Sequence, residues 1–271
     1  MQTRSLRGFR LLLVAVLAAA LPPAGAGAQQ PSPYRAIGYA TQWNPVQDKD
    51  LGKIDTLIFA FAVVKDGRVV LSDEAAQKLQ SLVALKVRSP KLKVDISIGG
   101  WAAGGFSEAA SSEQGRKLFA DSAARLVARY GADGLDIDWE YPGHHESGIA
   151  SSPDDRANFT LLLQAVRASL DRVGAEHGHT AKNHYTLSIA VADGPFVDGV
   201  DIAAVDKYVN WFNLMTYDFC NAMTPDTCHH AGLHASQYTP AMARSTDRAV
   251  QQFLAAGVAP YKLVIGAAFY G

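Results

Sequence analysis

Residues 131–142 read GADGLDIDWEYP and carry four acidic side chains within a single apolar segment. The last three acids stand at every second position: Asp136, Asp138 and Glu140. The residues that alternate with them are large and apolar: Leu135, Ile137 and Trp139. Because alternate side chains of a β-strand share one face, we predict a strand with the acids on one side and the apolar residues packed under helices on the other.

The rest of the chain repeats the pattern of an apolar strand followed by an amphipathic helix. The other segments that we interpret as strands are 34–40, 54–64, 91–101, 184–192, 208–218 and 261–271. Apolar residues at helical spacing predict helices over 73–88, 114–130, 154–173 and about 240–256. Near-continuous apolar strands separated by such helices are typical of a parallel sheet covered by helices.

We therefore predict an α/β protein with the fold of a (β/α)8 TIM barrel. The barrel is expected to be truncated after its seventh strand, because no eighth segment precedes residue 271. An open barrel is the alternative, and in both forms the first and seventh strands would have unpaired edges. No GxGxxG motif follows the first strand, which disfavours a dinucleotide-binding sheet.

Residues 1–28 have the three parts of a secretory signal peptide. Three arginines precede the apolar run LLLVAVLAAAL, and the small residues AGAGA follow it. The run is about half as long as the roughly 20 residues that a spanning helix needs, which argues against a membrane anchor. We expect cleavage after Ala28, a leader over 29–33 and a single barrel over 34–271, secreted as a monomer without a membrane span.

The composition narrows the class of protein further. The chain has 271 residues, a formal net charge of -1 and 48% hydrophobic residues. This fraction of hydrophobic residues is enough for one large core and argues against a disordered chain. The near-neutral charge gives no reason to expect nucleic acid as a partner.

Cys220 and Cys228 lie in one polar loop, and an exported protein would allow them to form a disulfide. The alternative, a reactive thiol or a metal site, lacks the second cysteine pair that zinc sites show. Two histidine pairs, His144–His145 and His229–His230, also lack zinc-ligand spacing, and we interpret them as loop histidines. We expect neither a metal nor a cofactor.

The row of acids predicts acid–base chemistry at one end of the sheet. Barrels of this kind keep their active sites at the carboxyl ends of the strands, where Glu140 lies. Nearby negative charge raises the pKa of a carboxyl group, so Glu140 should hold its proton near neutral pH and act as a general acid. Asp136 and Asp138 would share a proton. A magnesium or calcium site and a solvated acidic strand are the alternatives.

The segment DGLDIDWE, residues 133–140, matches the signature DxxDxDxE. Three further sequence motifs occur in the same order along the chain as in proteins with this signature. They are SIGGW at 97–101, MTYD at 215–218 and GAAFYG at 266–271. On these motifs, residues 34–271 resemble glycoside hydrolase family 18, the chitinases and their relatives. The resemblance implies a (β/α)8 barrel, in agreement with the alternation of strands and helices.

The resemblance also implies roles for individual residues. Glu140 would protonate the leaving glycosidic oxygen, and the 2-acetamido group of the sugar would then attack its own anomeric carbon. Asp138 would orient that acetamido group, Asp136 would exchange a proton or hydrogen bond with Asp138, and Tyr217 would bond the acetamido oxygen. The residues implied in substrate binding are Tyr39, Ser97, Trp101, Met215 and Asp218, with Trp43 as a further exposed ring.

The expected protein is thus a secreted chitinase that hydrolyses β-1,4 linkages in chitin or chitooligosaccharides. Two alternatives share the resemblance: an endo-β-N-acetylglucosaminidase that acts on N-glycans, and a non-catalytic chitin-binding relative. Retention of Glu140 beside Asp138 favours an enzyme over the binding protein. The tryptophan of the family's eighth strand and the arginine after FYG are not present in these 271 residues, which places the activity of this chain in question.

Overall fold

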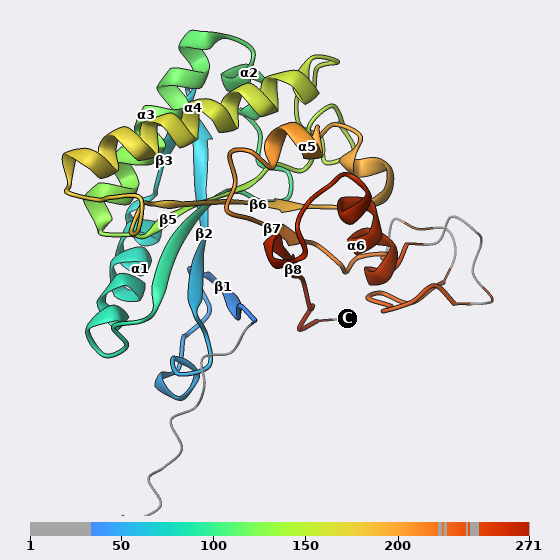
Figure 1. The fold of residues 1–271 in the computed structure, drawn as a ribbon, viewed down its shortest axis with the longest axis horizontal. Helices are drawn as coiled ribbons and strands as arrows, with labels where there is room; N and C mark the ends of the chain where they lie inside the picture. The colour runs from blue at the N-terminus through green and yellow to red at the C-terminus, as the bar shows by residue number, and fades with distance from the viewer. Residues whose placement is uncertain (1–33, 222–223, 225–226, 237, 239–243, 271) are drawn as a thin grey trace, which may run out of the picture. The chain divides into compact units, whose positions relative to one another are not determined.

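Seven parallel strands pair side by side in the computed structural model, in the order β1-β2-β4-β5-β6-β7-β8 (Figure 1). Their bounds are β1 Ile37–Thr41, β2 Thr56–Lys65, β4 Lys93–Gly99, β5 Gly134–Asp138, β6 Thr186–Val191, β7 Trp211–Leu214 and β8 Leu263–Ile265. This order confirms the predicted alternation. The sheet is that of a (β/α)8 barrel with seven of its strands, and β1 and β8 are its two edges.

The structure describes residues 34–221, 224, 227–236, 238 and 244–270. The predicted signal peptide and leader lie outside this part, as does the start of the helix predicted from residue 240. Residues 35–271 form one compact unit, to which the following description applies. Among the described residues, no helix combines the length and the apolar character needed to cross a membrane.

The four long helices lie where the apolar spacing predicts them, with differences at their ends, and two short helices are added. Their bounds are α1 Asp73–Ala84, α2 Phe106–Ala110, α3 Glu113–Tyr130, α4 Asp155–Glu176, α5 Ile202–Val205 and α6 Thr246–Ala255. Short 3-10 turns span Asp48–Asp50, Leu85–Val87, Gly194–Val197 and Pro260–Lys262. The sequence analysis missed α2, α5 and the strand β3 (Arg68–Val70), which forms an antiparallel hairpin with β2. All three are too short to show a periodic pattern.

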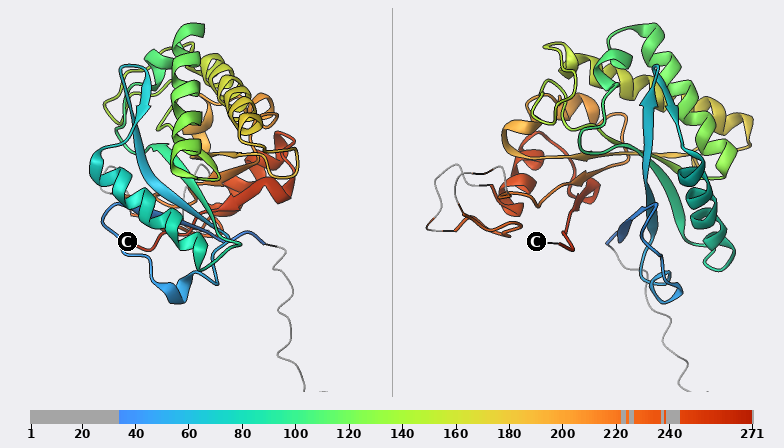
Figure 2. Two further views of the ribbon diagram at one scale, coloured as in Figure 1. Left: turned by 90° about the vertical axis from the view of Figure 1, so that its left-hand side faces the viewer. Right: turned by 180° about the vertical axis from the view of Figure 1, so that it is seen from behind.

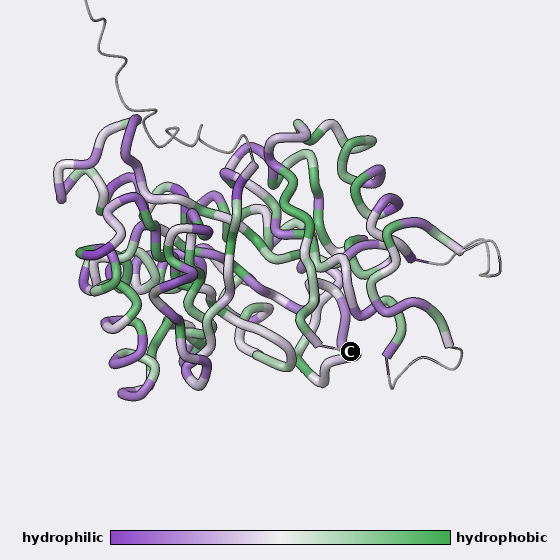
Figure 3. Tube along the Cα trace, turned by 90° about the horizontal axis from the view of Figure 1, so that it is seen from below, coloured by the Kyte–Doolittle hydropathy of each residue, from purple (hydrophilic) through white to green (hydrophobic). Residues whose placement is uncertain are grey.

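Serine caps begin three of the helices. Ser72 accepts a hydrogen bond from the backbone of Ala75 at α1, Ser112 from Gly115 at α3 and Ser245 from Arg248 at α6. Such side chains satisfy backbone N–H groups that the first turn of a helix leaves without a partner. Hydrophobic and hydrophilic residues alternate along these helices (Figure 3).

The apolar residues of β5 face the helix layer, as the alternation predicts. Trp139 stacks on Phe106 of α2 with ring centroids 5.4 Å apart, and it meets Phe159 of α4 edge to face at 5.4 Å. Leu135 and Ile137 are fully buried. Two further views show α1, α3 and α4 along the outer side of the strands (Figure 2). This packing fixes β5 in register and leaves its other face for the acids.

Candidate active site

Asp136 is fully buried and accepts four hydrogen bonds inside the barrel. Oδ2 accepts from Ser97 Oγ at 2.8 Å and from the Tyr39 hydroxyl at 3.0 Å. Oδ1 accepts from Ser188 Oγ at 2.7 Å and from Asn213 Nδ2 at 3.0 Å. These donors come from β1, β4, β6 and β7, so the sheet as a whole holds this carboxylate. Burial raises the pKa of Asp136, and the four hydrogen bonds act in the opposite direction.

Asp138 has a contrasting environment one pleat further along β5. It is 5% exposed, and its Oδ1 has no hydrogen-bond partner among the described residues. Burial, followed by the charges of Glu140 and Asp136, holds the pKa of Asp138 well above its ordinary value. The acceptor capacity of Asp136 is taken up by its own four donors. Asp138 therefore keeps one buried carboxyl oxygen that makes no hydrogen bond with the described residues.

Glu140 lies two residues beyond the end of β5 and is 9% exposed. Burial raises its pKa, a hydrogen bond with Tyr141 lowers it, and the charge of Asp218 raises it again. A carboxyl group with a raised pKa retains its proton to higher pH and can serve as an acid. Glu140 and Asp138 line one cavity of about 550 Å³.

The segment after β7 forms the opposite wall of this cavity. A strand that continued past Leu214 would turn Tyr217 and Asp218 to opposite sides. Instead β7 ends at Leu214, and Thr216 turns away and donates its hydroxyl to the carbonyl of Gly266 at 2.7 Å. Met215, Tyr217 and Asp218 consequently all line the cavity that holds Glu140.

Asp218 is held by several groups. Its backbone has a left-handed φ of 54°, which is uncommon for a residue with a side chain. Its carboxylate accepts a hydrogen bond from the Tyr270 hydroxyl at 2.8 Å and lies 3.5 Å from His230 Nδ1. A disulfide between Cys220 and Cys228, with Cα atoms 5.7 Å apart, lies between Asp218 and His230 in the sequence.

The remaining predicted site residues lie at the mouth of the barrel or in loops. Trp101 is half exposed, lines the cavity with Glu140 and meets Tyr141 edge to face at 6.3 Å. Trp43 is 79% exposed and lines neither cavity that contains Asp138. His144 lies 3.3 Å from Glu146, outside the acid row. In the described part of the chain, no cluster of His, Cys, Asp or Glu has a geometry suited to a metal ion.

The profile of the family described as Glycosyl hydrolases family 18 matches residues 35–271. The chain belongs to glycoside hydrolase family 18. It is similar to Chitinase A1 of Niallia circulans, with 31% identity over 96% of this chain and 45% of that protein. It is also similar to Chitinase 1 of Aphanocladium album, with 38% identity over 71% of this chain and 44% of that protein. The chain therefore spans less than half the length of these two relatives.

Solved structures of family 18 proteins share the fold. A family 18 N-acetylglucosaminidase from Paenibacillus barengoltzii matches with a TM-score of 0.82 and 42% identity, over 88% of this chain and 69% of that one. The chitinase domain of the spore coat protein CotE from Clostridium difficile matches with a TM-score of 0.77 and 35% identity, over 93% of this chain and 69% of that one. These similarities confirm the predicted barrel fold.

A second cavity of this family 18 chain, of about 720 Å³, lies between β1 and β8. Residues that line both cavities are Phe61, Asp138, Met215, Tyr217 and Tyr270. Asp138 is thus approached from two sides, by the cavity that contains Glu140 and by the one between the sheet edges.

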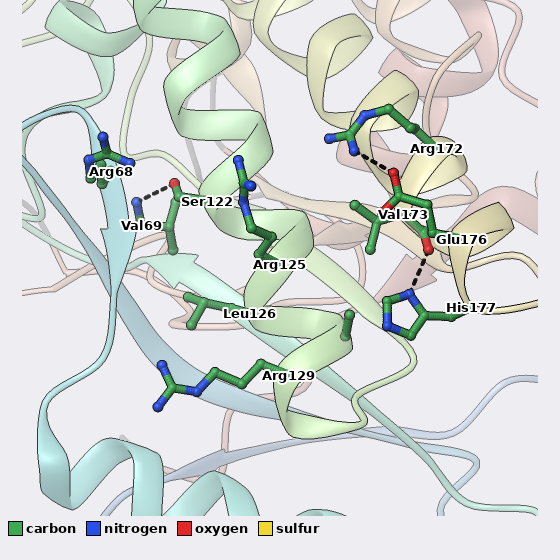
Figure 4. A pocket seen from close by; sticks show the side chains of 11 residues that line it. Arg68, Val69, Ser122, Arg125, Leu126, Arg129, Arg172, Val173, Glu176 and His177 are labelled. Carbon is green, nitrogen blue, oxygen red and sulfur yellow. Dashed lines mark hydrogen bonds and ion pairs between the residues drawn. The ribbon is translucent and has the colours of Figure 1, made fainter.

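A third cavity lies among the helices and is lined by four arginines (Figure 4). Two of them neutralise acids of the same helices: Arg172 pairs with Glu176 at 2.8 Å and with Asp121 at 2.9 Å, and Arg125 lies 3.7 Å from Asp121. No residue of the acid row lines this cavity. The cavity around Glu140 is therefore the candidate active site.

The sequence analysis missed several residues that shape the site. Ser188 and Asn213 bond Asp136, Tyr141 bonds Glu140, and His230 and Tyr270 face Asp218. A signal for the first two was present, because each is a polar residue inside an otherwise apolar strand. Ser97, Asp136 and Ser188 are direct partners in the register of β4, β5 and β6.

Proposed function

We propose that this chain carries the catalytic residues of a secreted chitinase, which hydrolyses β-1,4 linkages between N-acetylglucosamine units. The observation that carries the proposal is the shared cavity of Asp138, Glu140 and Tyr217, in which burial raises the pKa of both carboxyl groups. Family 18 membership and similarity to named chitinases support it. Residues 1–28 would direct export and be removed.

In the proposed reaction, Glu140 donates its proton to the glycosidic oxygen that leaves. The carbonyl of the substrate's 2-acetamido group attacks the anomeric carbon and forms an oxazolinium ion, so no enzyme nucleophile is required. Asp138 accepts a hydrogen bond from the acetamido N–H, and its ionised form balances the positive charge of this ion. Tyr217 bonds the acetamido oxygen. Glu140, now ionised, accepts a proton from the water that opens the ring and returns to its starting state.

A second candidate is the removal of single N-acetylglucosamine units from chain ends. It is favoured by the 42% identity to the solved N-acetylglucosaminidase from Paenibacillus barengoltzii. Chitinase and N-acetylglucosaminidase reactions would use the same acids, and they differ in the length of the product released.

The test compares the wild-type chain with Glu140→Gln on chitooligosaccharides and on an N-glycosylated protein. Glutamine has nearly the same shape as glutamate but cannot donate the proton, so we expect a loss of at least about 100-fold in kcat. Thermal unfolding of both proteins controls for damage to the fold. Wild-type rates in the variant would remove Glu140 from its role, and release of only single sugars would favour the second candidate. Cleavage of the glycoprotein alone would move the substrate to N-glycans.

A further inference from the structure

Arg244 lies just before α6 and contacts the segments that follow both β6 and β7. Its Nε donates to Asp193 Oδ1 at 2.7 Å, and its Nη2 makes a second, short contact with the same oxygen. Its Nη1 donates to the backbone carbonyl of Asp218 at 3.2 Å. The side chain of Arg244 is 20% exposed and that of Asp193 is 4% exposed, so this ion pair is largely shielded from water.

Two aromatic rings hold the guanidinium in place. Its carbon atom lies 5.0 Å from the ring centre of Phe219 and 5.5 Å from that of Phe196. Guanidinium groups bind favourably over aromatic faces, and a planar group with fixed neighbours loses few conformations when it forms its hydrogen bonds. Arg244 therefore joins three segments that are remote in sequence at one point beside the cavity of Glu140.

The contact of Arg244 with Asp218 lies at a residue with a left-handed backbone conformation. A φ of 54° at a residue with a side chain is sparsely populated, and it persists only where surrounding contacts fix it. The backbone N–H of the next residue, Phe219, donates to the carbonyl of His230 at 3.0 Å. Arg244 fixes the carbonyl on one side of this peptide unit while His230 fixes the N–H on the other.

We propose that Arg244, anchored by Asp193, is a positioning residue that keeps the carboxylate of Asp218 directed into the cavity of Glu140. The inference rests on the proposed function only for its effect on catalysis, because the contacts with Asp218 hold whatever the substrate is. We therefore expect Arg244 to influence the pKa of Glu140 indirectly, because it fixes the position of the Asp218 carboxylate.

The ionisable groups that face Glu140 in this cavity are Asp138, Tyr141, Tyr217, Asp218, Arg244 and Tyr270. The charge of Asp218 raises the pKa of Glu140. If the Asp218 carboxylate moves away from Glu140, the pKa of Glu140 falls. The alkaline limb of the pH–activity profile then moves to lower pH. Simple removal of the positive charge of Arg244 would have the opposite effect, since a nearby cation favours an ionised carboxylate. The direction of the change therefore separates positioning from a direct charge effect.

The decisive variant is Arg244→Lys, which keeps the charge but cannot bond Asp193 twice and Asp218 at once. We expect kcat/KM to fall at least fivefold, with the alkaline limb of its pH profile displaced to lower pH. In an Asp218→Asn background the same substitution should cause no further displacement. A limb that stays at the wild-type pH, or moves further in the double variant, would overturn the proposal.

A second measurement does not depend on activity. Hydrogen exchange of the peptide 215–219 should be at least tenfold faster in Arg244→Lys and in Arg244→Met, because the contact with the carbonyl of Asp218 is lost. Gln252→Ala is the matched control: Gln252 on α6 also holds the segment after β6, through Gly194 N at 2.9 Å, but it makes no described contact with Asp218. Wild-type exchange in both arginine variants, or equal acceleration in Gln252→Ala, would contradict the proposal. An inactive wild-type chain would count against the proposed function alone, since the exchange measurement would still decide the role of Arg244.

Discussion

Asn213 on β7 donates to Asp136 on β5 across the barrel interior, past the intervening strand β6. The orientation of this amide is fixed, because the indole N–H of Trp211 donates to Asn213 Oδ1 at 3.0 Å and leaves Nδ2 for the carboxylate. An indole nitrogen is only a donor, so the reverse orientation would lose both bonds. Two side chains of one short strand thus set the hydrogen bonding of an acid two strands away.

Asn213→Ala should lower kcat by about 10-fold to 100-fold and the free energy of unfolding by about 1–3 kcal/mol. The loss of one donor makes ionised Asp136 less favourable in its buried position. Trp211→Phe removes only the group that orients the amide, so it should cause a smaller effect of the same sign. Steady-state kinetics and urea unfolding measure both quantities, and an unchanged kcat in Asn213→Ala would contradict the assignment.

Asp218→Asn should displace the alkaline limb of the pH–activity profile to lower pH. Glu140 must be protonated to act as the acid, so activity is lost as the pH rises through its pKa. The negative charge of Asp218 raises that pKa, and the amide removes the charge. The pH dependence of kcat/KM on a chitooligosaccharide measures the shift, and a limb displaced to higher pH would exclude this electrostatic coupling.

Gly99→Ala should destabilise the protein by several kcal/mol and displace Asp138. Gly99 has a φ of 119°, and a Cβ atom placed there would lie 2.0 Å from the backbone oxygen of Asp138. Backbone must move to relieve such an overlap. Gly52→Ala is the control, because a Cβ at Gly52 meets nothing within 4 Å. Thermal unfolding of the two variants should differ clearly, and equal stability would show that β4 and β5 can separate without cost.

Asp95→Asn should make stability less dependent on pH. Asp95 is fully buried, and burial raises its pKa from 3.8 to about 7. Between these values the folded protein binds more protons than the unfolded chain, so the wild type loses stability as the pH rises toward 7. Above pH 7 the amide should be more stable than the wild type, by up to about 4 kcal/mol at 1.36 kcal/mol for each pH unit.

Urea unfolding of the wild type and Asp95→Asn at pH 5 and pH 8 tests this sign. The difference between the two proteins should grow in favour of the variant at the higher pH. A difference that is the same at both values would show that Asp95 does not change its protonation on unfolding.

The strands and long helices could be predicted because their apolar patterns reflect burial on one or both faces. The pattern of β5 also placed its apolar residues correctly against the helix layer, although it did not predict that α2 is part of that layer. It could not show that the strand ends at Asp138, or that β7 ends at Leu214, because both ends depend on contacts with distant segments. The hydroxyl of Thr216, bonded 50 residues away to Gly266, is one such contact.

The supports of the site were harder to predict than its acids. Arg244 and Asp193 stand in polar segments with no repeating pattern, and their pairing is set by where α6 packs against the segment after β6. Ser188 could have been identified from strand register once the order of the strands was known, whereas Asn213 is paired with Ala190 and not with Ser188. Pairwise contacts between loops carry no comparable signal in a single sequence.

The cavity between β1 and β8 also has a consequence for the medium around Asp138. The cavity between the sheet edges and the cavity that contains Glu140 both reach the side chain of Asp138, which is 5% exposed. A segment that covered the cavity between β1 and β8 would exclude water from it and lower the local dielectric constant. A negative charge on Asp138 would then be more costly. The proton affinity of Asp138 therefore depends on what lies between the two edge strands of the sheet.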